Sequence, residues 1–167
     1  MAVSPADFTH VDLLGLDIDG TLTDGMLFWG GPDIGWTQRF AVRDGEAILR
    51  LAACGLPIVP ISRNKSLCAK VRMQMLKLPT QWVGVDNKVA AVAQVAAAYR
   101  VAPQRMAYVG DGLEDGRVFA EVGLGCCVQD GHPQTQAAAH YVTLKPGGCG
   151  AVEEVIDRLM AARSQAT

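Results

Sequence analysis

The chain of 167 residues lacks several features that would place a protein in a class at once. No apolar stretch reaches about 18 residues, the length that a membrane-spanning helix needs, so we expect no membrane partner. The first twelve residues, MAVSPADFTHVD, have neither the basic start nor the apolar run of a signal peptide, and we expect a cytoplasmic protein. The Lys and Arg residues form no block and the net charge is −2, which argues against a nucleic-acid partner.

The sequence also lacks the cysteine and histidine patterns of disulfide scaffolds and zinc sites. Its five cysteines are an odd number with no CxxC spacing and one adjacent pair, and we expect reduced thiols. The three histidines, His10, His132 and His140, do not form a spaced metal set. His132 precedes Pro133 and is expected in a loop or in packing, with no catalytic role.

What the sequence does contain indicates one folded α/β domain over residues 1–167. Half of the residues are hydrophobic and 19% are charged, which excludes wholesale disorder. Short apolar runs alternate with helical patterns, as in a doubly wound parallel sheet with helices on both faces. Strands are expected at 11–16, 56–61, 82–85, 105–109, 124–128 and 140–143, and helices at 44–53, 65–76, 88–99, 114–122 and 150–162.

A β-hairpin is expected between the first strand and the first helix, over about residues 25–42. Apolar segments at 26–29 and 36–42 flank a turn rich in Gly, Pro and Asp. Pro57 and Pro60 lie in the second strand, and proline cannot donate to a strand ladder. That strand is therefore expected at an edge of the sheet or in a distorted position.

Two carboxyl side chains leave the first predicted strand together. Alternate residues of an extended segment point the same way, so Asp17 and Asp19 should face one pocket. Such anions repel each other unless a cation lies between them or one of them holds a proton. Either outcome would be useful: a magnesium ion could bind an oxygen of Asp17, and Asp19 could carry the proton that a leaving alkoxide needs. Gly20 would let the backbone turn and direct N–H groups at an anion, whereas the alternative is an ordinary Asx turn.

Other polar residues follow later strands, where ligands bind in open parallel sheets. Asp111 ends a strand and Asp115 lies one helical turn on, so both carboxylates could approach one ion, or could simply favour a helix N-terminus. Ser62 could donate to a phosphoryl oxygen or cap a helix. Lys88 and Arg43 could neutralise phosphate charge. Alternatively, Lys88 is an ordinary solvated lysine and Arg43 lies at the start of a helix.

Together these residues resemble the four motifs of the haloacid dehalogenase superfamily of phosphatases. DIDGT, the serine after the second strand, the lysine and GDGLED occur in that order. The segments DGTLTDG, RFAVRDG, DNK, HYVT and GGCGAVEEV are similar to one capless branch, the 3-deoxy-D-manno-octulosonate 8-phosphate phosphatases. The resemblance extends from about residue 13 to residue 159, which is nearly the whole chain.

The resemblance implies a mechanism and a set of roles. Asp17 would attack phosphorus and form an aspartyl-phosphate, and Asp19 would protonate the leaving oxygen and later deprotonate the attacking water. Ser62 and Lys88 would hold the phosphoryl oxygens. Magnesium would be bound by Asp17, Asp19 through its backbone carbonyl, and Asp111. Asp115 would position Lys88 or a metal-bound water.

The resemblance also implies a substrate class and an assembly. The substrate would be 3-deoxy-D-manno-octulosonate 8-phosphate or a related nonulosonate 9-phosphate, in lipopolysaccharide biosynthesis. Relatives form homotetramers in which the hairpins pack together and each C-terminal tail, residues 144–167 here, reaches a neighbour's site. No separate cap domain is expected.

Two positions depart from the branch, and alternative functions stay open. Asn64 stands where the branch commonly has Arg, and Cys149 where its tail usually has a basic residue. Such basic residues would suit a substrate carboxylate. One alternative is therefore a phosphatase of another small phosphorylated metabolite. Another is a non-catalytic oligomerisation domain, related to the C-terminal domains of acylneuraminate cytidylyltransferases.

Overall fold

The computed structural model describes residues 8–165. Residues 1–7 and 166–167, the two ends of the predicted domain, lie outside the described residues, as does most of the segment on which the signal-peptide argument rested. None of the helices between residues 8 and 165 is both long and apolar enough to cross a membrane.

The central sheet confirms the predicted α/β fold. Its five strands are parallel and lie in the order β4-β1-β5-β6-β7. They are β1 (Leu13–Leu16), β4 (Ile58–Pro60), β5 (Met106–Gly110), β6 (Leu124–Cys127) and β7 (Tyr141–Val142). The chain moves from β1 to β4 on one side and then crosses to β5 on the other. The carboxyl end of β1 is therefore the topological switch point, where such sheets bind ligands.

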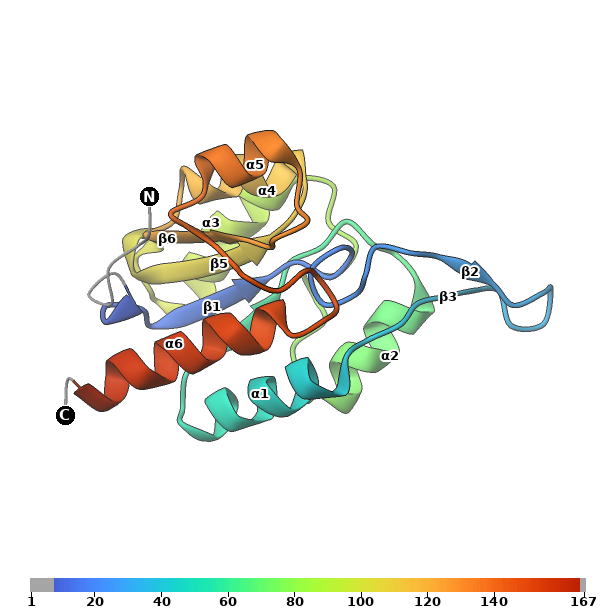
Figure 1. Cartoon of the computed structure of the whole chain (residues 1–167), viewed down its shortest axis with the longest axis horizontal. Helices are drawn as coiled ribbons and strands as arrows, with labels where there is room; N and C mark the ends of the chain where they lie inside the picture. The colour runs from blue at the N-terminus through green and yellow to red at the C-terminus, as the bar shows by residue number, and fades with distance from the viewer. Residues whose placement is uncertain (1–7, 166–167) are drawn as a thin grey trace.

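Helices cover both faces of the sheet (Figure 1). On one face lie α1 (Val42–Ala53), α2 (Leu67–Met75) and α6 (Ala151–Gln165), which bury residues such as Ile48, Met73 and Val155 in one core cluster. On the other lie α3 (Lys88–Tyr99), α4 (Leu113–Phe119) and α5 (Pro133–Ala138), with Val92 and Phe119 in the second cluster. Strand β4, with Pro60, is an edge strand, as predicted.

A hairpin projects from the domain between β1 and α1 (Figure 1). Its strands, β2 (Phe28–Trp29) and β3 (Trp36–Thr37), are shorter than predicted, although a bridge between Thr23 and Phe40 extends the pairing toward its base. Between β1 and β4 the chain holds only this hairpin and α1, so there is no separate cap in that described segment.

The segment 82–85 and the helices α5 and α1 differ from the sequence prediction. The segment 82–85 is not a strand, because it forms one bridge, Ser62 to Val83, and then turns, with the N–H groups of Gly84 and Val85 both donating to the carbonyl of Ser62. Helix α5 was not predicted, since its sequence PQTQAA has no apolar periodicity. Helix α1 begins at Val42, two residues before the predicted start.

The C-terminal tail packs within its own domain. Val152, Ile156 and Leu159 of α6 are fully buried in the core cluster that α1 shares. The buried Asp44 of α1 caps this helix, because its carboxylate accepts from the N–H groups of Gly150 and Glu153 at 3.2 and 2.9 Å. The buried face of α6 is therefore occupied by contacts within the same chain.

Candidate active site

The predicted site residues gather at the carboxyl ends of β1, β4 and β5. A cavity of about 610 Å³ lies there, with 11 lining residues. Six of these were predicted: Asp17, Asp19, Ser62, Lys88, Asp111 and Asp115. The parallel strands place these distant positions side by side, because their carboxyl ends meet at one edge of the sheet.

Asp17 follows β1 directly and lies at the bottom of the cavity. Its backbone N–H donates to the carbonyl of Val109 at 2.9 Å, which continues the ladder between β1 and β5. Its side chain is almost fully buried, and Oδ1 lies 2.8 Å from Nζ of Lys88. Burial, followed by the negative charge of Asp115, raises the pKa of Asp17 well above its ordinary value.

Lys88 is the first residue of α3, and it is buried between two carboxylates. Asn87 caps this helix by accepting from the N–H of Ala90 at 3.0 Å, which fixes where the lysine leaves the backbone. Its Nζ lies 2.7 Å from Oδ1 of Asp115 as well as close to Asp17. Burial alone would lower the pKa of Lys88, but the two carboxylates outweigh it and raise that pKa.

Asp115 uses both carboxylate oxygens within the protein. Oδ1 accepts from Lys88 and from the Tyr108 hydroxyl at 2.9 Å. Oδ2 accepts from the backbone N–H groups of Asp111 and Gly112 at 3.2 and 3.0 Å. Four donors leave this carboxylate little capacity for direct metal coordination. Its geometry suits the orientation of Lys88 and of the loop after β5.

Three carboxylates form a cluster with the donor chemistry that a hard divalent cation requires. Asp17, Asp111 and Asp115 offer oxygens that all lie within 4.8 Å of one another. Burial and the charge of Asp115 raise the pKa of Asp111 to about 6. A cation among these oxygens would remove the repulsion that raises both pKa values. The residues therefore fit magnesium, which prefers carboxylate oxygens and retains several waters.

Gly20 makes room for the Asp111 carboxylate. Its φ is +74°, and a Cβ at this position would lie 2.6 Å from Cγ of Asp111. The turn after β1 and the turn after β5 can approach each other this closely only because residue 20 has no side chain. Gly20 was predicted to bind phosphate; the structure places it against Asp111, and it is not among the residues that line the cavity.

The Asp19 carboxylate does not join the acidic cluster. Its Oδ1 accepts from Nδ2 of Asn64 at 2.8 Å and from Nε2 of Gln38. The side chain is thus held on the hairpin side of the cavity, so the prediction of Asp19 as a metal ligand does not extend to its carboxylate. A contribution from its backbone carbonyl stays a prediction.

The two remaining predicted residues lie in different places. Ser62 is buried in the cavity wall, and its hydroxyl accepts from the N–H of Asn64 at 3.2 Å. Arg43 does not line the cavity. It forms an ion pair with Glu153 of α6 at 2.9 Å, because α1 begins before it and directs it toward the C-terminal helix. A role for Arg43 in phosphate binding therefore has no support from its position.

Residues without a predicted role also contact the predicted ones, among them Tyr108, His132 and Gln38. Tyr108 supports Asp115 from within β5, and His132 lines the cavity while its backbone N–H donates to the carbonyl of Asp111 at 2.8 Å. Gln38 reaches Asp19 from the hairpin. The alternation of side-chain directions along β5 could have indicated which face of the sheet Tyr108 occupies. No local signal in the sequence indicates Gln38 or His132.

Known proteins resemble this chain over nearly its whole length. A model of haloacid dehalogenase-like hydrolases matches residues 84–156. A 3-deoxy-D-manno-octulosonate 8-phosphate phosphatase of Salmonella typhimurium is 36% identical, over 98% of this chain and 88% of its own length. The crystal structure of the Yersinia pestis phosphatase of that name has a TM-score of 0.91 at 32% identity, covering 96% of this chain and 86% of that one.

A further similar structure comes from Moraxella catarrhalis. It is a 3-deoxy-D-manno-octulosonate 8-phosphate phosphatase in complex with a magnesium ion, a phosphate ion and a KDO molecule. Its TM-score is 0.91 at 30% identity, with 96% of this chain and 92% of that chain covered.

The raised pKa of Asp111 predicts how stability changes with pH when no metal is bound. This carboxyl titrates near 3.8 in the unfolded chain and at about 6 in the folded one, so folding stability falls as the pH rises through that window. In EDTA at about pH 7.5, we expect Asp111→Asn to raise the Tm by roughly 3 °C or more, measured by scanning calorimetry.

The same variant tests the metal site without an activity assay. Magnesium should raise the Tm of the wild type by mass action and leave that of Asp111→Asn unchanged. Asp157→Asn, at an exposed carboxylate on α6, is the control and should behave as the wild type does. Equal magnesium shifts in all three proteins would contradict a site at Asp111.

Proposed function

The chain belongs to the haloacid dehalogenase-like hydrolases and is a phosphatase, and from this premise we propose that it is a magnesium-dependent phosphomonoesterase of a sugar-acid phosphate. The observation that carries the proposal is the buried Asp17 carboxylate, paired with Lys88 at 2.8 Å and next to Asp111 and Asp115. We infer that residues 1–167 act as one domain with this single site.

In the first chemical step, a carboxylate oxygen of Asp17 attacks the phosphorus of the substrate. The bond from phosphorus to the leaving oxygen breaks, and Asp19 gives that oxygen its proton, so a neutral alcohol leaves. Lys88 and Ser62 face the same cavity and would bind the phosphoryl oxygens. The product of this step is an aspartyl-phosphate on Asp17.

In the second step, a water molecule attacks the aspartyl-phosphate. Asp19, now a carboxylate, takes a proton from that water, and the bond between phosphorus and the Asp17 oxygen breaks. Inorganic phosphate leaves, and both aspartates return to their starting protonation states. One group thus serves as acid and then as base, and the covalent route divides one difficult displacement into two.

Magnesium would be held by Asp17 and Asp111, with the backbone carbonyl of Asp19. Asp115 would act through Lys88 and through waters, since its own oxygens accept from four donors. When bound, the ion supplies charge stabilisation for the phosphoryl group in transfer.

The proposed substrate is 3-deoxy-D-manno-octulosonate 8-phosphate or a related nonulosonate 9-phosphate, used in lipopolysaccharide biosynthesis in the cytoplasm. The names of the similar phosphatases support the first of these, as does the KDO molecule in the Moraxella catarrhalis structure. One observation favours another small sugar phosphate as second candidate. A cavity of about 430 Å³ beside Asp19 is lined by neutral polar residues such as Gln38 and Asn64, and by no cation among its lining residues.

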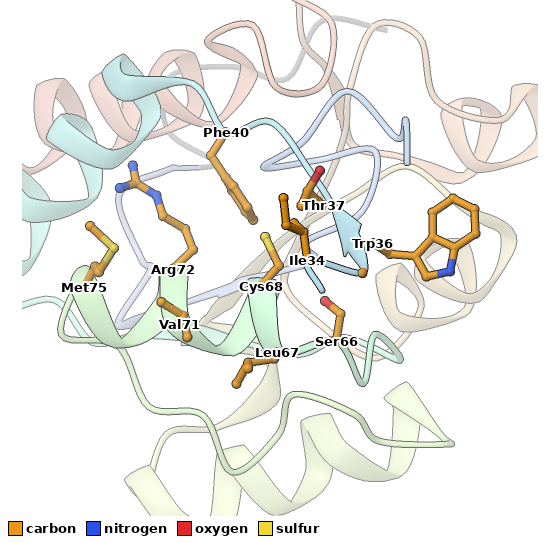
Figure 2. A pocket seen from close by; sticks show the side chains of 11 residues that line it. Ile34, Trp36, Thr37, Phe40, Ser66, Leu67, Cys68, Val71, Arg72 and Met75 are labelled. Carbon is orange, nitrogen blue, oxygen red and sulfur yellow. The ribbon is translucent and has the colours of Figure 1, made fainter. Parts of the chain in front are cut away.

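We also propose that the chain forms homotetramers through its hairpin. The hairpin exposes large apolar side chains, including Leu27 and Trp29, each 58% accessible. Beside it, an apolar groove of about 670 Å³ runs between the β3 arm and α2 (Figure 2). Ile34 and Phe40 lie on one side of this groove, and Cys68 and Val71 on the other. Contiguous apolar surface of this kind marks association sites on soluble proteins.

Light scattering tests the assembly. The wild type should have four times the chain mass, and Trp29→Ser should reduce that mass by removing a large apolar contact. Leu49→Ser on α1 is the control, because Leu49 is also exposed, at 44%, but lies outside the hairpin, the groove and the C-terminal tail. A monomeric wild type, or dissociation of both variants alike, would contradict the proposed interface.

Replacement of the nucleophile tests the enzymatic role against that of a non-catalytic oligomerisation domain. With magnesium, the wild type should hydrolyse p-nitrophenyl phosphate and Asp17→Asn should lose at least about 10³-fold in kcat, because an amide cannot attack phosphorus effectively. Mass spectrometry of acid-quenched wild type should detect one added phosphoryl group. Inactivity of both proteins would favour the role of a non-catalytic oligomerisation domain. Full activity of Asp17→Asn would show that Asp17 is not the nucleophile.

A substrate panel tests the leaving group. It contains 3-deoxy-D-manno-octulosonate 8-phosphate, a nonulosonate 9-phosphate, glucose 6-phosphate and ribose 5-phosphate. The sugar-acid phosphates should have a kcat/KM at least about 10-fold above the neutral ones, a difference of about 1.4 kcal/mol. The reverse order would support the second candidate, a phosphatase of neutral sugar phosphates.

A further inference from the structure

Two amide side chains hold the Asp19 carboxylate by a single oxygen. Gln38, from the hairpin arm after β3, and Asn64, from the loop between β4 and α2, both donate to Oδ1 of Asp19. The amides also contact each other, since Nδ2 of Asn64 lies 3.2 Å from Oε1 of Gln38. Asp19 lines both the cavity with the acidic cluster and the cavity of about 430 Å³ on the hairpin side.

The orientation of both amides follows from one backbone donor. The N–H of Ser66 donates to Oδ1 of Asn64 at 2.7 Å, and a backbone N–H can only donate. The amide nitrogen of Asn64 must therefore face Asp19 and Gln38. Because it donates to Oε1 of Gln38, the nitrogen of Gln38 must also face Asp19. Both amide groups thus direct donors at the same carboxylate oxygen.

We propose that Gln38 and Asn64 are positioning residues for the proton transfers of Asp19, holding its Oδ1 so that Oδ2 exchanges the proton with the leaving alcohol and the attacking water. This inference rests on the proposed function. Amides suit the task because they carry no proton that they can lose at physiological pH and thus do not compete with Oδ2 for the transferred proton.

The amide clamp, formed by Gln38 and Asn64, also links proton transfer by Asp19 to the position of the hairpin. Gln38 directly follows Thr37, the last residue of β3, so a shift of the hairpin would move its amide away from Asp19. Asn64 is fixed independently, because its backbone N–H donates to Ser62 at 3.2 Å and its side chain accepts from the residue that caps α2. Correct docking of the hairpin is therefore a condition for efficient proton transfer.

The leaving group provides a readout that a merely structural tie would not change. An alkoxide needs a proton as it leaves, whereas p-nitrophenolate is a stable anion and needs little help. The value of kcat/KM reports the first phosphoryl transfer, which is the step that contains this proton. Gln38→Met keeps the length of the side chain and removes its donor. We expect its loss on the best alkyl phosphate of the panel to exceed its loss on p-nitrophenyl phosphate by about 10-fold.

Three further proteins identify the cause. Thr37→Ala removes only the bond from the Thr37 hydroxyl to the carbonyl of Phe28 and keeps both amide donors on Asp19, so it should leave the alkyl-to-aryl ratio unchanged. Gln38→Asn keeps a neutral amide donor on a side chain one methylene shorter, and it should retain more of the ratio than Gln38→Met does. In an Asp19→Ala background, Gln38→Met should change the ratio no further, because a residue that acts through Asp19 has no effect once Asp19 is absent.

The outcomes separate this inference from the proposed function. If the wild type hydrolyses both substrate types and Gln38→Met loses equally on both, the clamp has no role in proton transfer. Additive effects of Gln38→Met and Asp19→Ala would overturn the inference in the same way, as would hydrolysis of the aryl phosphate alone by the wild type. No magnesium-dependent hydrolysis of either type would overturn the proposed function, and the inference with it.

Discussion

The site depends on the buried ammonium group of Lys88, which is held between two buried carboxylates. Lys88 Nζ lies 2.8 Å from Asp17 and 2.7 Å from Asp115, and all three side chains are nearly inaccessible to water. Buried charges are costly unless they are paired, so each of these groups fixes the position of the other two. This triad joins the end of β1, the start of α3 and the first turn of α4, elements that are far apart in the chain.

The triad leaves the two remaining acidic groups with separate tasks. Asp111 lies against Gly20 and carries a pKa raised to about 6 by burial and by the nearby charge, which suits a group that awaits a cation. Asp19 is drawn to the opposite side by Gln38 and Asn64. In the proposed mechanism, metal binding and proton transfer would thus be divided between two sides of one cavity, with the proposed nucleophile, Asp17, between them.

Prediction from sequence succeeded where the signal was local and failed where it depended on partners. The edge position of β4 follows from its prolines, and the bounds of α3 follow from an uninterrupted apolar and alanine pattern that begins after Asn87. The segment 82–85 has the composition of a strand but finds only one bridge at the sheet edge. Helix α5 is polar and short, and packing against α4 rather than periodicity makes it a helix.

The sequence by itself determined the parallel sheet, the hairpin and the positions of Asp17, Asp111 and Lys88 at element ends, because periodicity, turn residues and caps are local properties. Only the tertiary structure decided which of these side chains meet. It turned Arg43 toward Glu153 and away from the cavity, and it brought Gln38 to Asp19 across 19 residues of chain. The directions of side chains from separate elements depend on how those elements pack, which no local pattern encodes.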